Sequence, residues 1–141
     1  MATGLKFFFD ANLSPHLARG INGFTRIFND VEKVVALADK FPHDIKDVEF
    51  IERLSQEGTW CNVSCDPFTK RHGAEREAIR RGGHTVFVLT SQWTSIQYWQ
   101  QAERLVRWWP QIVQQARMVE KAMFSVPFKH SQSSKFKQIS M

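Results

Sequence analysis

The sequence has little of what marks secreted or membrane proteins. It contains only two cysteines, Cys61 and Cys65, and no further Cys or His lies at zinc-ligand spacing from them. This excludes a disulfide framework and disfavours a structural zinc site. Uninterrupted apolar stretches are far shorter than the roughly 18–20 residues that cross a bilayer, and the N-terminus has no secretory leader pattern. We therefore expect a cytoplasmic protein with no membrane contact.

The chain does have enough apolar side chains for one sizeable core. It has 141 residues, of which 43% are hydrophobic and 13% aromatic, as expected for a single domain. The net charge of +5 favours an anionic partner such as a nucleic acid or an acidic protein. Basic residues are concentrated in 70–81 and after Met118, whereas residues 39–57 are acidic on balance. We expect a domain over residues 1–128 and a basic, disordered tail over 129–141.

Short apolar runs alternate with helical patterns along the chain. Strands are predicted at residues 5–9, 31–37, 59–64 and 85–89, with an edge strand at 123–128. Helices are predicted from Pro15 to Gly20 or Gly23, from a cap at Asp47 to Gly58, over 75–81, and over a long pattern from 96 to 119. Residues 39–43 are expected to be a loop, and Pro110 should kink or divide the long helix. This alternation predicts an α/β fold with a mostly parallel sheet of four to five strands and helices on both faces.

Three aspartates fall where such a sheet binds its ligands. Asp10 follows the first predicted strand, Asp47 begins the second main helix, and Asp66 follows the third strand. Each alone suits a turn or a helix cap. Carboxylates that converge repel one another unless a hard cation such as Mg²⁺ or Mn²⁺ neutralises them. The set therefore predicts a metal site at the carboxyl edge of the sheet.

Several segments together resemble a known family. The first is Phe-Phe-Phe-Asp-Ala-Asn-Leu-Ser-Pro at 7–15, followed by Leu-Ala-Arg. Its Asn-Leu-Ser-Pro part and Arg-Trp-Trp-Pro at 107–110 are the most specific segments. Shorter matches follow in order at 41–42, 47–51, 63–66, 75–78, 86–89 and 105–110. Over about residues 5–128 the chain resembles PIN-like ribonuclease domains, specifically the compact branch that includes VapC-type toxins of bacterial toxin–antitoxin pairs.

The resemblance implies a PIN-like three-layer fold and an endoribonuclease that is the toxin of a type II pair, with a cognate antitoxin as its partner. It also implies that Asp10, Asp47 and Asp66 bind Mg²⁺ or Mn²⁺, with Glu49 or Glu75 as a further catalytic acid. Related domains often carry another acid about three residues after the strand-three aspartate, where this chain has Thr69.

Basic and aromatic residues supply candidate contact surfaces. The basic residues near the acids could hold RNA phosphates or form a solvated helix face; they are Lys70, Arg71, Arg76 and Arg80. The tryptophans between 93 and 109 favour core and interface positions over stacking on RNA bases. Because four tryptophans exceed what one helix face needs, Tyr98 and Trp99 are predicted to contact a second copy of the chain or the antitoxin.

Three functions remain open from the sequence. The leading one is a Mg²⁺- or Mn²⁺-dependent endoribonuclease, in which carboxylates hold one or two metal ions that activate water and basic side chains hold the RNA backbone. The second is a catalytically silent PIN-like module that binds RNA or a protein, supported by Thr69. The third is a receiver-like phosphotransfer domain, because Asp66 and Thr90 end predicted strands; against it, Asp10 is followed by Ala11 instead of another acid.

Overall fold

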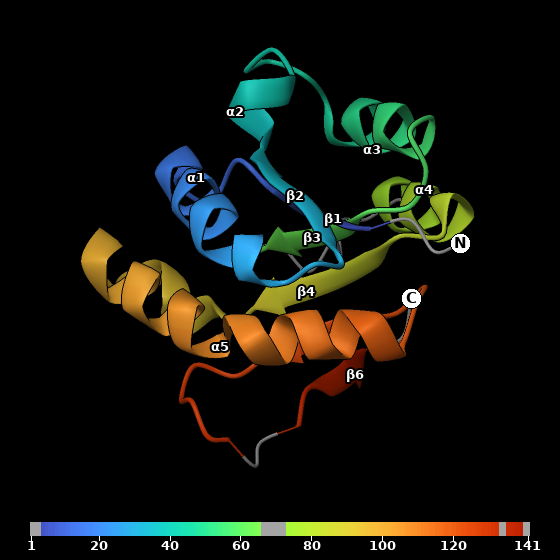
Figure 1. Ribbon diagram of the computed structural model, residues 1–141. Helices are drawn as coiled ribbons and strands as arrows, with labels where there is room; N and C mark the ends of the chain where they lie inside the picture. The colour runs from blue at the N-terminus through green and yellow to red at the C-terminus, as the bar shows by residue number, and fades with distance from the viewer. Residues whose placement is uncertain (1–3, 66–72, 133–134, 140–141) are drawn as a thin grey trace.

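A six-stranded sheet forms the centre of the computed structural model (Figure 1), which describes residues 4–65, 73–132 and 135–139. The strands are β1 (Leu5–Phe9), β2 (Val31–Ala36), β3 (Cys61–Ser64), β4 (Thr85–Leu89), β5 (Met123–Val126) and β6 (Lys137–Ile139). Their order is β2-β1-β3-β4-β5-β6, and only β6 runs antiparallel to its neighbour. The predicted α/β class with a mostly parallel sheet is confirmed.

Helices cover both faces of the sheet and give three layers, consistent with a PIN-like fold. They are α1 (Pro15–Phe24), α2 (Leu37–Lys40), α3 (Asp47–Ser55), α4 (Ala74–Gly82) and α5 (Tyr98–Met118), with 3₁₀ turns at Thr25–Ile27 and Ser91–Ser95. The α1 and α5 helices pack on one face, and α3 and α4 pack on the other (Figure 1). Among the helices of the described ranges, none combines the length and apolarity needed to cross a bilayer.

Strand β1 contributes to the core on both faces of the sheet. Its three phenylalanines have no exposed surface. Phe7 and Phe9 face α5, with ring centroids 4.7 Å and 5.9 Å from that of Trp109, whereas Phe8 stacks on Phe50 of α3 at 5.3 Å. A strand buried on both faces needs no polar alternation, which is why this segment is a continuous apolar run.

Several predicted boundaries are wrong. Helix α1 continues through Gly20 and Gly23, because burial of Leu17, Ala18 and Ile21 outweighs the low helix propensity of glycine. Residues 37–40 form the short helix α2 instead of a strand end and loop. The N-cap of α3 is Lys46, so Asp47 is its first residue, and β3 begins at Cys61 instead of Thr59.

Helix α5 is not divided at Pro110. The helix is continuous over 21 residues, and its ribbon changes direction partway along (Figure 1). Proline removes one backbone hydrogen bond and displaces the preceding turn, but buried side chains on both sides of it hold the helix on the sheet. These include Leu105, Trp109, Ile112 and Val113.

The predicted disordered tail is wrong for part of residues 129–141. Lys137–Ile139 forms β6 on the outer side of β5, so the described residues form six strands instead of four or five, and β5 is not the edge. Phe136 anchors this segment, because its ring lies 5.8 Å from Phe87 and 5.3 Å from Trp108. This partly buried aromatic contact outweighs a composition that otherwise favours disorder.

A buried hydrogen-bond chain joins α3 to β4. The His84 side chain has no exposed surface, and its Nδ1 accepts the backbone N–H of Trp60 at 2.9 Å. The ring proton must therefore lie on Nε2, which donates to Ser55 Oγ at 2.9 Å, while the Ser55 hydroxyl donates to the Ile51 carbonyl. The imidazole lone pair thus faces away from Ser55, so this pair is structural and not a nucleophile with its base.

The burial of His84 in this hydrogen-bond network makes the free energy of unfolding depend on pH. Burial lowers the pKa of His84 below its ordinary value of 6.5. As the pH is lowered, His84 is therefore protonated in the unfolded state at a higher pH than in the folded state. The free energy of unfolding should then fall as pH drops below about 6.5, by at most about 1.4 kcal/mol per pH unit. Urea unfolding at several pH values measures it. His84→Asn, whose amide oxygen can still accept from Trp60, should lose the dependence; exposed His43→Asn should keep it, and equal slopes in both variants would contradict the assignment.

Two helical glycines should respond oppositely to alanine. A Cβ at Gly20 meets no atom within 4 Å, so Gly20→Ala should stabilise the protein by about 0.5–1 kcal/mol through helix propensity. A Cβ at Gly82 would lie 2.6 Å from His84 Nε2 and still closer to Ser55 Oγ, so Gly82→Ala should destabilise it by about 1–3 kcal/mol. Thermal unfolding of both variants checks this, and a shift in the same direction for both would refute it.

Candidate active site at the carboxyl edge of the sheet

The topology places the carboxyl ends of the parallel strands and the starts of the main helices at one edge of the sheet. Strands β1 to β5 are parallel, so their carboxyl ends lie along the same edge. The α1, α3, α4 and α5 helices each connect two of these strands and therefore begin at that edge. Unpaired N–H groups and the positive end of the dipole at a helix start favour negative charge. Acidic side chains and anionic ligands are thus both favoured here.

Asp10 is held at this edge by bonds from two strand ends. It directly follows β1, and only 8% of its surface is exposed. Its Oδ1 accepts the N–H of Ala11 at 2.6 Å, and its Oδ2 accepts the hydroxyl of Ser64 at 3.0 Å. The Asn12 amide donates to Ser64 Oγ at 3.0 Å and accepts the N–H of Cys65 at 3.1 Å. This network ties the end of β1 to the end of β3 and fixes the orientation of the Asp10 carboxylate.

Asn12 and Ser64 are functional candidates that the sequence analysis did not select. The sequence could have indicated both, because they are polar residues at the ends of predicted strands. Two further polar atoms on β3 and after β4 are buried without a hydrogen-bond partner among the described residues, Asn62 Nδ2 and Thr90 Oγ1. Buried polar groups of this kind usually bind ordered water or a ligand. Thr90 directly follows β4 and so lies at the same edge of the sheet as Asp10, whereas Asn62 lies within β3.

The other predicted acids lie at helix starts. Asp47 and Glu49 are the first and third residues of α3, and Glu75 is the second residue of α4. Glu49 is exposed and pairs with Arg53 on its own helix at 3.1 Å. Within residues 4–65, 73–132 and 135–139, no three His, Cys, Asp or Glu side chains lie close enough together to hold a metal ion. Asp66 lies outside the described residues, so the predicted three-aspartate set stays a prediction.

Two of the four predicted basic residues can be placed on α4. Arg76 is half-buried, and Arg80 is exposed and pairs with Glu77, with Nη2 and Oε1 2.8 Å apart. Their hydrogen bond raises the pKa of Arg80 and lowers the pKa of Glu77. Arg80 thus has the contacts of a solvated helix face. Lys70 and Arg71 lie outside the described residues.

Asp39 is an acid beyond the end of β2 that the sequence analysis did not select. Helix α2 directly follows β2, so Asp39 lies at the same edge of the sheet as Asp10. Arg19 binds it with two nitrogens, at 3.0 Å and 2.5 Å, and this hydrogen bonding lowers the pKa of Asp39. A carboxylate committed to an arginine is a poor candidate for a metal ligand. Asp39 can therefore serve as a control residue when the acids of the candidate site are substituted.

The two thiols do not supply a nucleophile. Burial, together with the nearby charge of Asp10, raises the pKa of Cys65 to about 11. Burial and the charge of Glu120 raise the pKa of Cys61 to about 12. Both thiols are therefore protonated at neutral pH.

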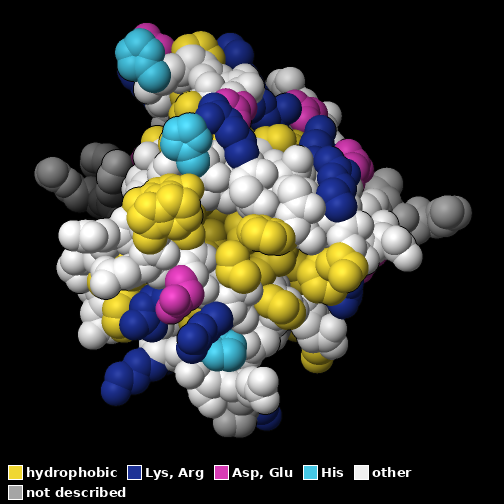
Figure 2. Space-filling view, turned by 60° about the vertical axis from the view of Figure 1, so that its left-hand side comes forward, with side chains coloured by type: hydrophobic (Ala, Val, Ile, Leu, Met, Phe, Trp, Pro, Cys, Tyr) yellow, Lys and Arg dark blue, Asp and Glu magenta, His cyan; other side chains and the backbone are white. Residues whose placement is uncertain are grey.

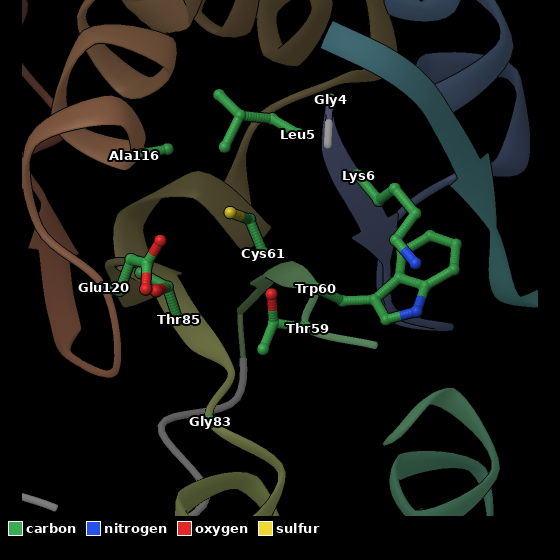
Figure 3. A pocket seen from close by; sticks show the side chains of 10 residues that line it. All are labelled: Gly4, Leu5, Lys6, Thr59, Trp60, Cys61, Gly83, Thr85, Ala116 and Glu120. Atoms are coloured by element: carbon green, nitrogen blue, oxygen red, sulfur yellow. The ribbon is translucent and has the colours of Figure 1, made fainter. Parts of the chain in front are cut away.

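A small polar cavity lies at the opposite edge, where β1, β3 and β4 begin. It has a volume of about 70 Å³, and Figure 3 shows Glu120 and Thr85 on one side of it and Lys6 beside Trp60 on the other. The Thr85 hydroxyl already accepts the backbone N–H of Lys121 at 3.1 Å. With one carboxylate and room for little more than water, this cavity is a poor candidate for an active site.

Strand order alone does not distinguish the PIN-like fold from the receiver-like fold, both of which were considered from the sequence. The order β2-β1-β3-β4-β5 is also that of flavodoxin-like domains, which include receivers. A comparison with protein families separates them, because the PIN-like domain family matches residues 5–91, more than half of the chain. Neither the curated proteins nor the solved structures contain a match. PIN-like domains are often nucleases, and the receiver alternative is set aside by the match. The chain belongs to the PIN-like domain family.

Proposed function

We propose that this PIN-like domain is a Mg²⁺- or Mn²⁺-dependent endoribonuclease that hydrolyses RNA phosphodiester bonds. The observation that carries the proposal is the Asp10 carboxylate, held in one orientation at the carboxyl edge by Ala11 and Ser64. Catalysis by positioned charge requires a group whose geometry is set before the substrate arrives. A carboxylate placed only for a turn would not need a second strand to orient it.

The chemistry of the donor set fits a hard divalent cation. Asp10, Asp47 and Asp66 would hold the ion, with Glu75 or Glu49 as a further acid. Carboxylate oxygens are the ligands that Mg²⁺ and Mn²⁺ prefer over soft thiol ligands. When bound, such an ion activates a water molecule and stabilises the leaving oxygen.

Basic residues would position the RNA backbone beside these acids. Residues 70–81 contain five Lys or Arg and two Glu, and α4 begins at the carboxyl edge. Arg76 lies one turn nearer that edge than Arg80, so we assign it the larger share of phosphate binding, with Lys70 and Arg71 preceding the helix. A toxin role with a cognate antitoxin is the finer proposal. A neighbouring small gene for a DNA-binding protein would support it.

Removing an acid should weaken metal binding without unfolding the protein. Asp10→Asn and Asp66→Asn should each reduce Mn²⁺ affinity by about tenfold or more, because each removes a charged ligand. Isothermal titration calorimetry with Mn²⁺ measures the affinity. Asp39→Asn is the matched control, since Asp39 is bound by Arg19, and it should bind Mn²⁺ like the wild type. Unchanged affinity in both site variants would remove the metal-site proposal.

Replacing an acidic residue and replacing basic residues should impair cleavage in different ways. Asp66→Asn should abolish cleavage and retain RNA binding, whereas Arg76→Ala with Arg80→Ala should weaken binding and reduce its salt-dependence slope by about one to two. Single-turnover cleavage of a mixed RNA pool with Mg²⁺ or Mn²⁺, together with filter binding at several salt concentrations, measures both effects.

Arg117→Ala is the control for the basic substitutions, because Arg117 lies near the C-terminal end of α5, away from the site, and pairs with Asp30. It should bind RNA as the wild type does. A wild-type protein that binds RNA and cuts none with either metal would refute the nuclease proposal and favour the silent RNA-binding module.

A further inference from the structure

Three lysine side chains converge on one buried tryptophan, Trp60, which packs on the face of the sheet that α3 and α4 cover. The ammonium nitrogens of Lys6, Lys33 and Lys40 lie 4.9 Å, 5.3 Å and 5.4 Å from the centroid of its ring. Figure 3 shows the Lys6 side chain against this ring. Trp60 is 1% exposed, whereas the three lysines are partly exposed, so solvent can reach their ammonium groups. These three residues form the lysine cluster.

Two members of the lysine cluster are direct neighbours on parallel strands. Lys6 of β1 lies in register with Lys33 of β2. Side chains at such positions point to the same face of the sheet, so the two positive charges are side by side. Like charges on neighbouring strands repel and destabilise the sheet unless an opposite charge compensates for them.

The carboxylates that the structure describes compensate for this charge only in part. Glu57 binds Lys40, with Oε2 2.8 Å from Nζ, whereas Lys33 and Glu32 are 3.9 Å apart. Lys6 donates to the backbone carbonyl of Glu57, which has no formal charge. Three ammonium groups therefore share one carboxylate in close contact.

Other basic residues of the described chain are paired more closely with acids. Arg19 binds Asp39 through two nitrogens, and Arg117 binds Asp30 at 2.8 Å. Figure 2 shows Lys and Arg side chains beside Asp and Glu on the face formed by α1 and α5. The lysine cluster differs because its positive charges lie closer to one another's aromatic support than to matching acids.

We propose that the lysine cluster is a binding site for a phosphate group, carried either by a small phosphate ester or by an RNA backbone. A phosphate presents several acceptor oxygens and can bind several N–H donors at once, and lysine binds it as a point charge. The Nε1 of Trp60 is a further buried donor without a partner among the described residues. Lys6 lies near the start of β1, so this site is separate from Asp10, which follows the end of that strand.

The turn after α3 positions the Lys6 ammonium before any ligand arrives. Besides the bond to Glu57, the position of Gly58 matters, because a Cβ there would lie 3.3 Å from Lys6 Nζ. Gly58 has a φ of +107°, which L residues rarely adopt. A phosphate would thus meet a donor that is already held in place, which reduces the entropy lost on binding.

Titration with inorganic phosphate tests the site. The chain has five tryptophans, so a proton–nitrogen correlation spectrum contains five indole signals, and Trp60→Phe identifies one by its loss. At pH 7, without metal ions and at constant ionic strength, phosphate should shift this signal with a Kd of about 1–10 mM. Lys33→Gln should weaken binding by about fivefold or more. Lys137→Gln, at an exposed position of β6, should bind as the wild type does.

Thermal unfolding at low ionic strength supplies a second readout. Without phosphate, Lys33→Gln removes a charge that Lys6 repels and should raise the Tm by about 1–4 °C, whereas losing a lysine that merely covers Trp60 would lower it. Lys137→Gln should leave the Tm unchanged. A lower Tm for Lys33→Gln, or a Trp60 indole signal that phosphate does not shift, would overturn the site.

A short RNA distinguishes the two sources of the phosphate group. In EDTA, Lys33→Gln should weaken binding of an RNA of about ten nucleotides and reduce its salt-dependence slope by about one if the group belongs to an RNA backbone. Unchanged RNA binding, together with weakened binding of inorganic phosphate, assigns the site to a small phosphate ester. None of these measurements uses a metal ion or cleavage, so their outcome is independent of the nuclease proposal.

Discussion

Parallel pairing of β1 between β2 and β3 is the constraint on which the rest of the structure depends. It buries three consecutive phenylalanines, which contact helices on both faces of the sheet. It also requires every connection between parallel strands to return across the sheet through a helix. As a result, Asp10 directly follows the central strand of this group, and the starts of α1, α3 and α4 lie along the same edge. The position of the candidate site follows from the pairing that forms the core.

The site and the fold stabilise each other through the bond between Ser64 and Asp10. A carboxylate with 8% exposed surface is costly unless hydrogen bonds compensate for lost water. Ser64 and Ala11 supply two such bonds, and Asn12 holds Ser64 in place. Glu49 and Arg80, by contrast, lie in exposed pairs along their own helices, where neither partner orients the other toward the edge. Orientation by neighbouring strands therefore distinguishes Asp10 from Glu49 and Asp39, which pair with arginines on helices.

Local patterns by themselves determined much of this protein. The apolar runs predicted β1 and β4 to the residue, helical spacing predicted α5, and strand ends selected Asp10. Only tertiary structure revealed β6, the link from Asn12 through Ser64 to Asp10, and the chain from Trp60 through His84 to Ser55. Each of these depends on residues distant in sequence. The physical reason is that burial and hydrogen-bond partners are properties of folded neighbours, whereas propensity and periodicity are properties of adjacent residues.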